Sequence, residues 1–241
     1  MLLDRDKNQV AVYSINDYQL LRHLNLPGLK SHGYSGMTSC VRHKCLYMSG
    51  NRCIHRYHLA SSAISKWSVP GEPGGLSVTP SCNLLVTCDE PNKLVELSAD
   101  SGQCVREIAL QSDIVEPWHG VQLTTGQFVV CHGDLQGNSL PRVCVVGDDG
   151  KVTRSYGGQC GSDVGQLHEP LHLAVDKDSQ FIFVADFCIG CNNRGVVLLS
   201  PTLEFVRYVG ERLRARRLYL HQATRRLFVG QWPGCVTVIQ L

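Results

Sequence analysis

The chain has 241 residues, a length that fits one large β domain or two small domains. Its formal net charge of +2 is too small to indicate a general nucleic-acid binder, because such proteins carry a clear basic excess. No run approaches the roughly 18 consecutive apolar residues of a membrane-spanning helix, and the N-terminal sequence MLLDRDKNQ lacks the apolar core of a signal peptide. We therefore expect a cytoplasmic protein with no membrane partner.

Short apolar or alternating runs separated by turn residues follow one another along the whole chain, and no segment has convincing amphipathic helical spacing. The N-terminal residues 1–29 supply three short strands. Four units of four strands each follow, and the last residues, 211–241, supply three more strands. The expected boundaries of the four full units are about 33–70, 71–111, 115–158 and 165–210. This pattern predicts a single all-β domain over residues 1–241.

The clearest unit lies between Gly165 and Leu199, where Asp186 closes the second of its apolar runs. Counterparts of Asp186 recur along the chain, each after a short apolar run. Their spacing varies from 39 residues (Gly50 to Asp89) to 54 residues (His132 to Asp186). The full set is Asp4, Gly50, Asp89, His132, Asp186 and Gln231. A repeat of this length is typical of propeller blades.

In the clearest unit a Gly-Gln-Leu sequence is followed by Pro, by an apolar run ending in Val-Asp, by Phe-Val-Ala-Asp and by Asn-Arg with an apolar run. This order resembles one NHL repeat, the blade unit of a class of β-propellers. The whole chain is most similar to the C-terminal propeller of tripartite-motif (TRIM-NHL) proteins. The resemblance implies a six-bladed propeller of four-stranded antiparallel blades that selects partners, either protein or RNA. It also implies that any ubiquitin-ligase activity belongs to an upstream RING region.

The expected strands number 22, whereas six four-stranded blades require 24. The first blade is expected to lack its inner strand and the last blade its outer strand, so both would be incomplete. Open sheet edges invite aggregation, and propellers normally close their ring. We therefore expect the chain to be a fragment whose upstream residues complete the ring.

An antiparallel meander decides which connections share a face of the disc. Connections from a fourth strand to the next first strand, and from a second to a third strand, open on one face, which we call the first face. Arginine beside exposed aromatic rings suits both protein hot spots and base stacking. The candidate partner-binding residues on this face are Arg52, Lys93, Trp118, Arg142, Arg194, Arg212, Arg214 and Trp232.

Seven arginines between Arg207 and Arg226 resemble a nucleic-acid patch. The predicted meander divides them, because Arg212 and Arg214 fall on the first face whereas Arg225 and Arg226 fall on the opposite face. This division favours a protein partner, with single-stranded RNA as the alternative.

The 12 cysteines lie mostly in apolar runs, which favours buried free thiols over a disulfide framework. Cys188 and Cys191 form a Cys-x-x-Cys pair, but no second pair completes a zinc site. His119 and His172 follow equivalent Glu-Pro contexts at the start of first strands, which line a propeller's central channel. Two histidines do not define a catalytic metal site, which normally needs three protein ligands. We expect no catalytic residue, no metal, no cofactor and no small-molecule substrate, and a channel-centred metal-dependent hydrolase or lyase is the alternative.

Overall fold

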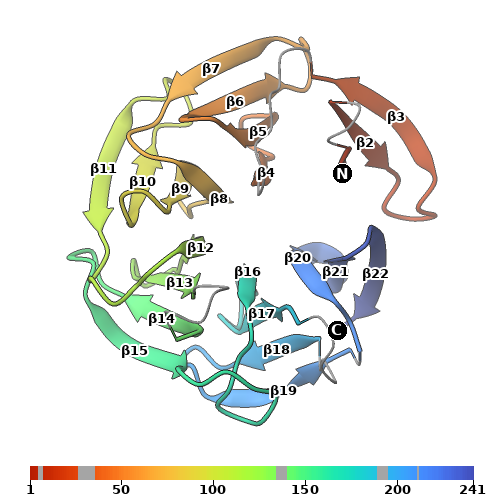
Figure 1. The fold of residues 1–241 in the computed structure, drawn as a ribbon. Coiled ribbons are helices and arrows are strands. Elements are labelled where there is room, and N and C mark those ends of the chain that lie inside the picture. Colours follow the sequence, from red (N-terminus) through yellow and green to blue (C-terminus); the bar gives the residue numbers. More distant parts are fainter. Residues whose placement is uncertain (5–7, 27–35, 134–139, 189–194, 211) are drawn as a thin grey trace.

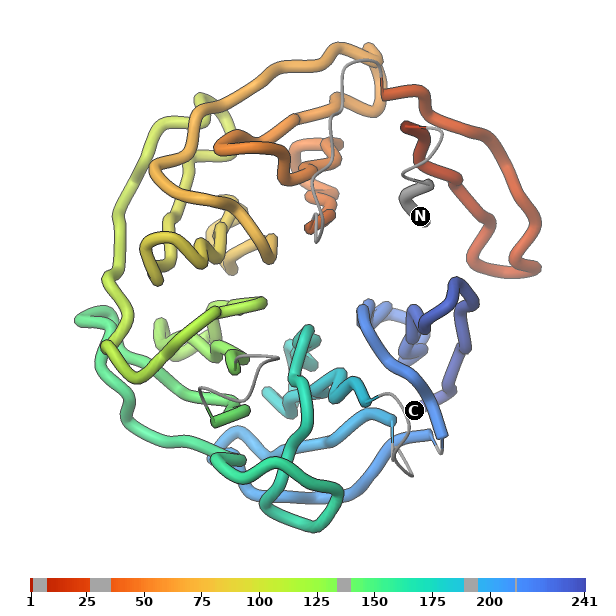
Figure 2. The backbone as a smooth tube through the Cα atoms, in the orientation of Figure 1, coloured from red at the N-terminus to blue at the C-terminus, as the bar shows by residue number. Residues whose placement is uncertain are grey.

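The computed structural model describes residues 1–241 except 5–7, 27–35, 134–139, 189–194 and 211. The described residues form 22 strands in six antiparallel sheets, which stand around a ring in chain order (Figures 1 and 2). No described helix is long and apolar enough to cross a bilayer.

Four of the sheets have four strands, and in each the strands are paired in chain order. They consist of β4 (Met37–Cys40), β5 (Cys45–Gly50), β6 (Cys53–His58) and β7 (Ile64–Ser68); β8 (Pro73–Val78), β9 (Leu84–Cys88), β10 (Lys93–Leu97) and β11 (Cys104–Ala109); β12 (Pro117–Gln122), β13 (Phe128–His132), β14 (Arg142–Val146) and β15 (Val152–Gly157); and β16 (Pro170–Val175), β17 (Ile182–Asp186), β18 (Val196–Leu199) and β19 (Phe205–Val209). The predicted propeller of four-stranded antiparallel blades is confirmed at this level.

The two ends of the chain form three-stranded sheets: β1 (Leu2–Asp4), β2 (Gln9–Tyr13) and β3 (Leu20–Asn25), and β20 (Ala215–His221), β21 (Arg226–Gln231) and β22 (Cys235–Gln240). Six complete four-stranded blades are therefore not formed. A fourth strand is missing from each terminal sheet, and no strand pairing joins these two sheets within the described residues.

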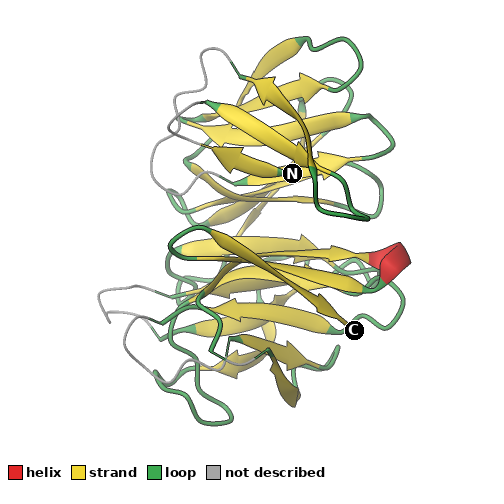
Figure 3. Ribbon diagram, turned by 90° about the vertical axis from the view of Figure 1, so that its right-hand side faces the viewer, coloured by secondary structure: helices red, strands yellow, loops and turns green. Residues whose placement is uncertain are grey.

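The strands differ in burial according to their place in the sheet. Second strands such as β9, β13 and β17 are buried along their whole length because neighbouring sheets cover both of their faces. Outer strands such as β7 and β11 are mostly exposed. Seen from the side, the strands cross the thickness of the disc, and the 3-10 helix η1 (Gln222–Thr224) lies at one face (Figure 3).

Five hydrophobic clusters fill the five interfaces between sheets that follow one another in the chain. For example, Leu85 and Leu94 of one sheet pack with Phe128 and Val130 of the next. Between the last sheet and the first, the described residues form no such cluster. We call this interface the seam. Tyr18 and Phe228 meet across it edge to face, with ring centroids 6.3 Å apart, and the Arg226 guanidinium donates to the Ile15 carbonyl oxygen at 3.0 Å.

Ten cysteines are free thiols, and six of them are buried, as expected for small apolar core residues. Burial raises the pKa of the Cys88 thiol to about 12, so this sulfur is unreactive as a thiolate. Cys188 is disulfide-bonded, which differs from the free thiol expected for most cysteines. Cys191, the other cysteine of the predicted pair, lies outside the described residues.

Candidate partner-binding face

The residue that ends a second strand anchors the connection that enters the same sheet. One carboxylate oxygen of Asp186 accepts hydrogen bonds from the backbone N–H groups of His168 and Glu169, both at 2.8 Å. Gln231 anchors the corresponding connection in the last sheet, where its side-chain oxygen accepts a hydrogen bond from the backbone N–H of Arg214 at 3.0 Å. In these two sheets, the polar side chain at this place in the repeat therefore holds a loop of the first face.

Arg214 and Trp232 are the two predicted site residues that the described contacts bring together. The guanidinium carbon of Arg214 lies 5.7 Å from the centroid of the Trp232 ring. The Trp232 N–H donates to the Arg214 carbonyl oxygen at 3.2 Å, so the two loops are also joined through the backbone. Trp232 stays 43% exposed. An exposed tryptophan held by a cation and by backbone hydrogen bonds is a rigid apolar contact point.

Three other predicted cations are each held by a carboxylate. The Lys93 Nζ lies 2.6 Å from the Glu107 Oε2, and the Arg142 Nη2 lies 2.7 Å from the Asp113 Oδ2. The Arg52 Nε lies 3.7 Å from the Glu72 Oε1. The Lys93 and Arg142 side chains are only 12% and 18% exposed. The Arg142 guanidinium beside Asp113 lowers the pKa of that carboxyl, mainly through the hydrogen bond between them. The positive charges of Lys93 and Arg142 are therefore largely neutralised within the protein, whereas the Arg52 side chain stays mostly exposed.

The remaining predicted site residues differ in exposure. The partly buried indole N–H of Trp118 donates to the Gly133 carbonyl oxygen at 3.0 Å. Arg212 is exposed on the connection between β19 and β20. Arg194 lies outside the described residues. The carboxylates that pair with the predicted cations were not anticipated from the sequence. Glu72 and Asp113 belong to connections and lie 20 or more residues away in the sequence from the cations that they contact. Only Glu107 could have been found from the strand pattern, because it lies two residues along β11 from Ala109, the residue opposite Lys93, and so shares a face with Lys93.

A small open pocket lies on the same face, beside the Asp186 anchor. Its lining includes Gln166, His168, Asp186 and Tyr208. A hydrogen bond with Asp186 raises the pKa of the His168 imidazole, since the charged ring is favoured beside a carboxylate. Burial raises the pKa of the neighbouring Glu169 carboxyl to about 7, although Arg216 acts in the opposite direction. The Glu169 carboxyl therefore titrates near neutral pH, but the pocket is too small to enclose a ligand.

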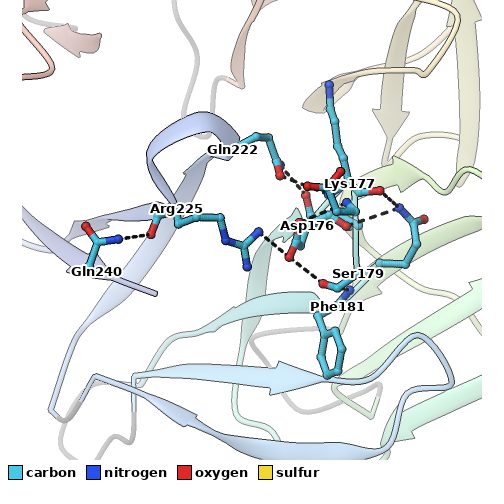
Figure 4. A network of polar contacts seen from close by, with 10 residues as sticks. Asp176, Lys177, Ser179, Phe181, Gln222, Arg225 and Gln240 are labelled. Atoms are coloured by element: carbon cyan, nitrogen blue, oxygen red, sulfur yellow. Dashed lines mark hydrogen bonds and ion pairs between the residues drawn. The ribbon is translucent and has the colours of Figure 1, made fainter.

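Most of the basic run at the C-terminal end is used inside the fold. Arg225 donates to the buried Asp176 carboxylate at 2.6 Å, on the face opposite the candidate site (Figure 4). The same carboxylate accepts from the Ser179 hydroxyl at 2.6 Å, and Gln222 accepts from the Lys177 N–H at 3.2 Å. Arg216 lies over the Phe187 ring at 4.6 Å. The prediction that the run divides between two faces agrees with these contacts.

The two channel histidines are stacked, with ring centroids 3.8 Å apart. The His119 Nδ1 accepts from the Leu173 N–H at 3.3 Å, so the proton of the neutral ring is on Nε2, which lies 3.1 Å from the Leu76 carbonyl oxygen and donates to it. The His172 Nδ1 likewise accepts from the Leu218 N–H at 3.4 Å. Each histidine thus joins its own inner strand to the inner strand of the next sheet.

This arrangement leaves His119 without a ring nitrogen for a metal. Burial lowers the pKa of His119 to about 4 and that of His172 well below its usual value, which keeps both rings neutral. In the part of the chain that the structure describes, no group of three or more His, Cys, Asp or Glu side chains is placed to hold a metal ion. The geometry therefore assigns the two histidines a role in joining strands.

No protein-family model matches the chain, and no curated protein matches it. Solved structures do resemble it. A chain of a nidogen/laminin complex aligns over 98% of this chain and 87% of its own length, with a TM-score of 0.70 and 15% identity. The β-propeller domain of Myceliophteria thermophila Cps50 (Swd1) covers 98% of this chain and 78% of its own, with a TM-score of 0.62 and 11% identity. Virginiamycin B lyase from Staphylococcus aureus likewise covers 98% of this chain and 78% of its own, with a TM-score of 0.62 and 11% identity. At these identities the likeness shows the fold: the protein is a β-propeller.

Proposed function

We propose that this propeller is a non-catalytic protein-binding module that uses the first face. The observation that carries the proposal is the exposed Trp232 ring, held beside Arg214 by a cation–π contact and a backbone hydrogen bond. Tryptophan and arginine are the residues most enriched at binding hot spots, and rigid anchors lose little entropy on binding. Propellers commonly bind proteins, and the chain of a nidogen/laminin complex has this fold.

A protein partner is favoured over single-stranded RNA by the charges of this face. Lys93, Arg142 and Arg52 already have carboxylate partners, so each would have to exchange an internal ion pair for a phosphate contact. Such an exchange adds little net electrostatic attraction.

The finer proposal follows the NHL-like repeat. We propose a cytoplasmic propeller that selects substrates for a tripartite-motif-like ubiquitin ligase. The motif between Gly165 and Leu199 supports this assignment. Sequencing the transcript upstream of Met1 tests it. A RING-encoding upstream region supports the ligase assignment, and an upstream region without one removes it while leaving the binding module in place.

Proximity labelling in cells tests the binding face. We expect a specific set of labelled proteins to be lost in Trp232→Ala. The affinity for a purified partner should fall at least tenfold, which corresponds to the loss of about 1.4 kcal/mol of binding free energy at one hot spot. Lys151→Ala is the matched control, because its exposed side chain lies in a turn on the opposite face. Equal labelling by wild type and Trp232→Ala would remove the first face from the binding site.

Titration with pooled single-stranded RNA at several salt concentrations separates the two partner classes. We expect no binding at physiological salt. Tight binding whose affinity falls steeply with salt would establish the RNA alternative, because each phosphate contact releases counterions.

The metalloenzyme alternative is tested by metal analysis of the purified protein, and a stoichiometric metal that is lost in His172→Ala would establish it.

A further inference from the structure

The connection between β19 and β20, residues 210–214, is anchored by one apolar side chain. Leu213 packs against the apolar cluster between the last two sheets, and a Cβ atom at Gly210 would collide with it. The two residues beside Leu213 are Arg212 and Arg214, and both are exposed. Because this connection opens on the first face, it presents two guanidinium groups there.

The arginines that follow in the same run are used within the fold. Arg216 lies over the Phe187 ring, 4.6 Å from its centroid. Arg217 donates to the Arg216 carbonyl oxygen at 2.9 Å, and both side chains are only partly exposed. Arg212 and Arg214 therefore carry most of the positive charge that residues 210–217 expose to solvent.

These two arginines differ from the other predicted cations of the first face. Neither Arg212 nor Arg214 forms an ion pair with any carboxylate that the structure describes. By contrast, Lys93 and Arg142 have carboxylate partners at 2.6 and 2.7 Å, and Arg52 has one at 3.7 Å. Among the described residues, the unpaired charge of this face is therefore concentrated at one connection.

The exposed Trp232 ring lies beside this charge. Its centroid is 5.7 Å from the Arg214 guanidinium carbon, and the side-chain oxygen of Gln231 accepts from the Arg214 N–H at 3.0 Å, so the two connections form one surface. We call Arg212, Arg214 and Trp232 the Trp232 patch. An apolar ring flanked by two cations is complementary to an apolar side chain flanked by carboxylates.

We propose that the Trp232 patch binds an acidic segment of a partner protein. One apolar side chain of the segment packs on the Trp232 ring, and carboxylates beside it pair with Arg212 and Arg214. This inference rests on the proposed function and adds the chemistry of the partner. A short polypeptide segment fits better than a nucleic acid, because a phosphate backbone requires positive charge along its whole path and these cations lie at one connection.

Selection from a random dodecapeptide library on the purified chain tests the class of partner. We expect the enriched peptides to have a net negative charge and a shared large apolar residue, and to be lost when the selection uses Trp232→Ala. Neutral peptides that still require Trp232 would overturn the acidic segment and leave the first-face binding module in place. Enriched peptides that bind Trp232→Ala equally would overturn both, and no enrichment would overturn the peptide partner.

Variants of Arg212 isolate the contribution of charge, since none of the described contacts joins this side chain to the Trp232 ring. The affinity for an enriched peptide should fall about tenfold in Arg212→Glu, where attraction becomes repulsion. It should stay within about twofold of wild type in Arg212→Lys, which keeps the charge. Arg154→Glu is the matched control, because Arg154 is likewise exposed but lies on the outer strand β15.

Circular dichroism of each variant confirms that it folds. The proposal is overturned if Arg212→Glu binds the peptide as tightly as wild type, or if Arg154→Glu weakens binding equally. An oligouridylate that binds wild type and is lost in Arg212→Glu, with no acidic peptide enriched, would assign the Trp232 patch to nucleic acid instead.

Discussion

At the scale of single residues, the channel histidines use their ring nitrogens in hydrogen bonds that join neighbouring inner strands. We call the His119 contacts the joint. His119 contacts a carbonyl group on β8 and an N–H group on β16, so its neutral ring bridges three consecutive sheets. A protonated ring cannot accept the Leu173 N–H, and burial opposes its charge. The joint therefore requires one tautomer of an uncharged imidazole.

This requirement predicts acid sensitivity. The pKa of His119 is about 4 when folded against an ordinary value of 6.5, so the unfolded state binds more protons between these values. Stability is fully present above pH 6.5 and is lost as the pH falls toward 4, by up to about 3 kcal/mol for this group. Urea unfolding at pH 7.5 and pH 5 measures the loss. His119→Gln, which does not titrate, should reduce the pH dependence, whereas the exposed His23→Gln should leave it unchanged. An unchanged pH dependence in His119→Gln would show that the joint does not control acid stability.

At the scale of elements, neighbouring inner strands approach in two ways. Gly75 occupies the level of His119 and His172 in the preceding sheet. A Cβ atom at Gly75 would lie in collision with the Trp118 carbonyl oxygen and 2.8 Å from the His119 Cα. The inner strands β8 and β12 therefore contact each other directly through backbone as well as through the His119 ring, whereas β12 and β16 are joined through that ring. Glycine is needed only where the backbones meet.

Two adjacent glycines make this a controlled experiment. Gly75→Ala should destabilise the protein by about 2 kcal/mol or more, because β8 and β12 must move apart. Gly74→Ala should cost little, since its new Cβ would meet the nearest atom at 3.6 Å, an ordinary van der Waals distance. Thermal unfolding of the two variants compares them directly. Similar melting temperatures would show that the inner strands can shift without penalty.

The elements were largely predictable from the sequence, and the contacts between sheets were not. Runs such as Ile182–Asp186 predict a strand, because apolar residues are followed by a turn. The repeat then predicts the position of each strand within its sheet. Nothing local distinguishes Gly74 from Gly75, or shows that His119 bonds to Leu76 and Leu173. The same limit applies to the candidate site, where Trp232 was recognisable as an exposed loop aromatic but the pairing of Arg142 with Asp113 depends on how two loops are folded.

At the scale of the whole molecule, the interfaces between neighbouring sheets are not equally well packed. Five interfaces between sheets contain a buried apolar cluster, whereas the described contacts at the seam are the Tyr18 and Phe228 rings and the hydrogen bond from Arg226. Apolar burial is the main stabilising contribution between packed sheets. The N-terminal sheet is therefore attached firmly only on its β4–β7 side, through the cluster that contains Val10, Leu24 and Leu46.

This inequality predicts the order in which the ring opens. Amides of β2 and β3 should exchange with solvent faster than those of β13 and β17, which are buried between two sheets, because local opening follows the weakest interface. Tyr18→Ala removes the aromatic contact across the seam, worth about 0.5–1.5 kcal/mol, and should accelerate exchange in β2 and β3 while leaving β13 unchanged. Tyr13→Ala is the control, because this exposed tyrosine ends β2 without a described ring partner. If Tyr18→Ala accelerates exchange equally in every sheet, the ring unfolds as one cooperative unit and the seam is not its weakest interface.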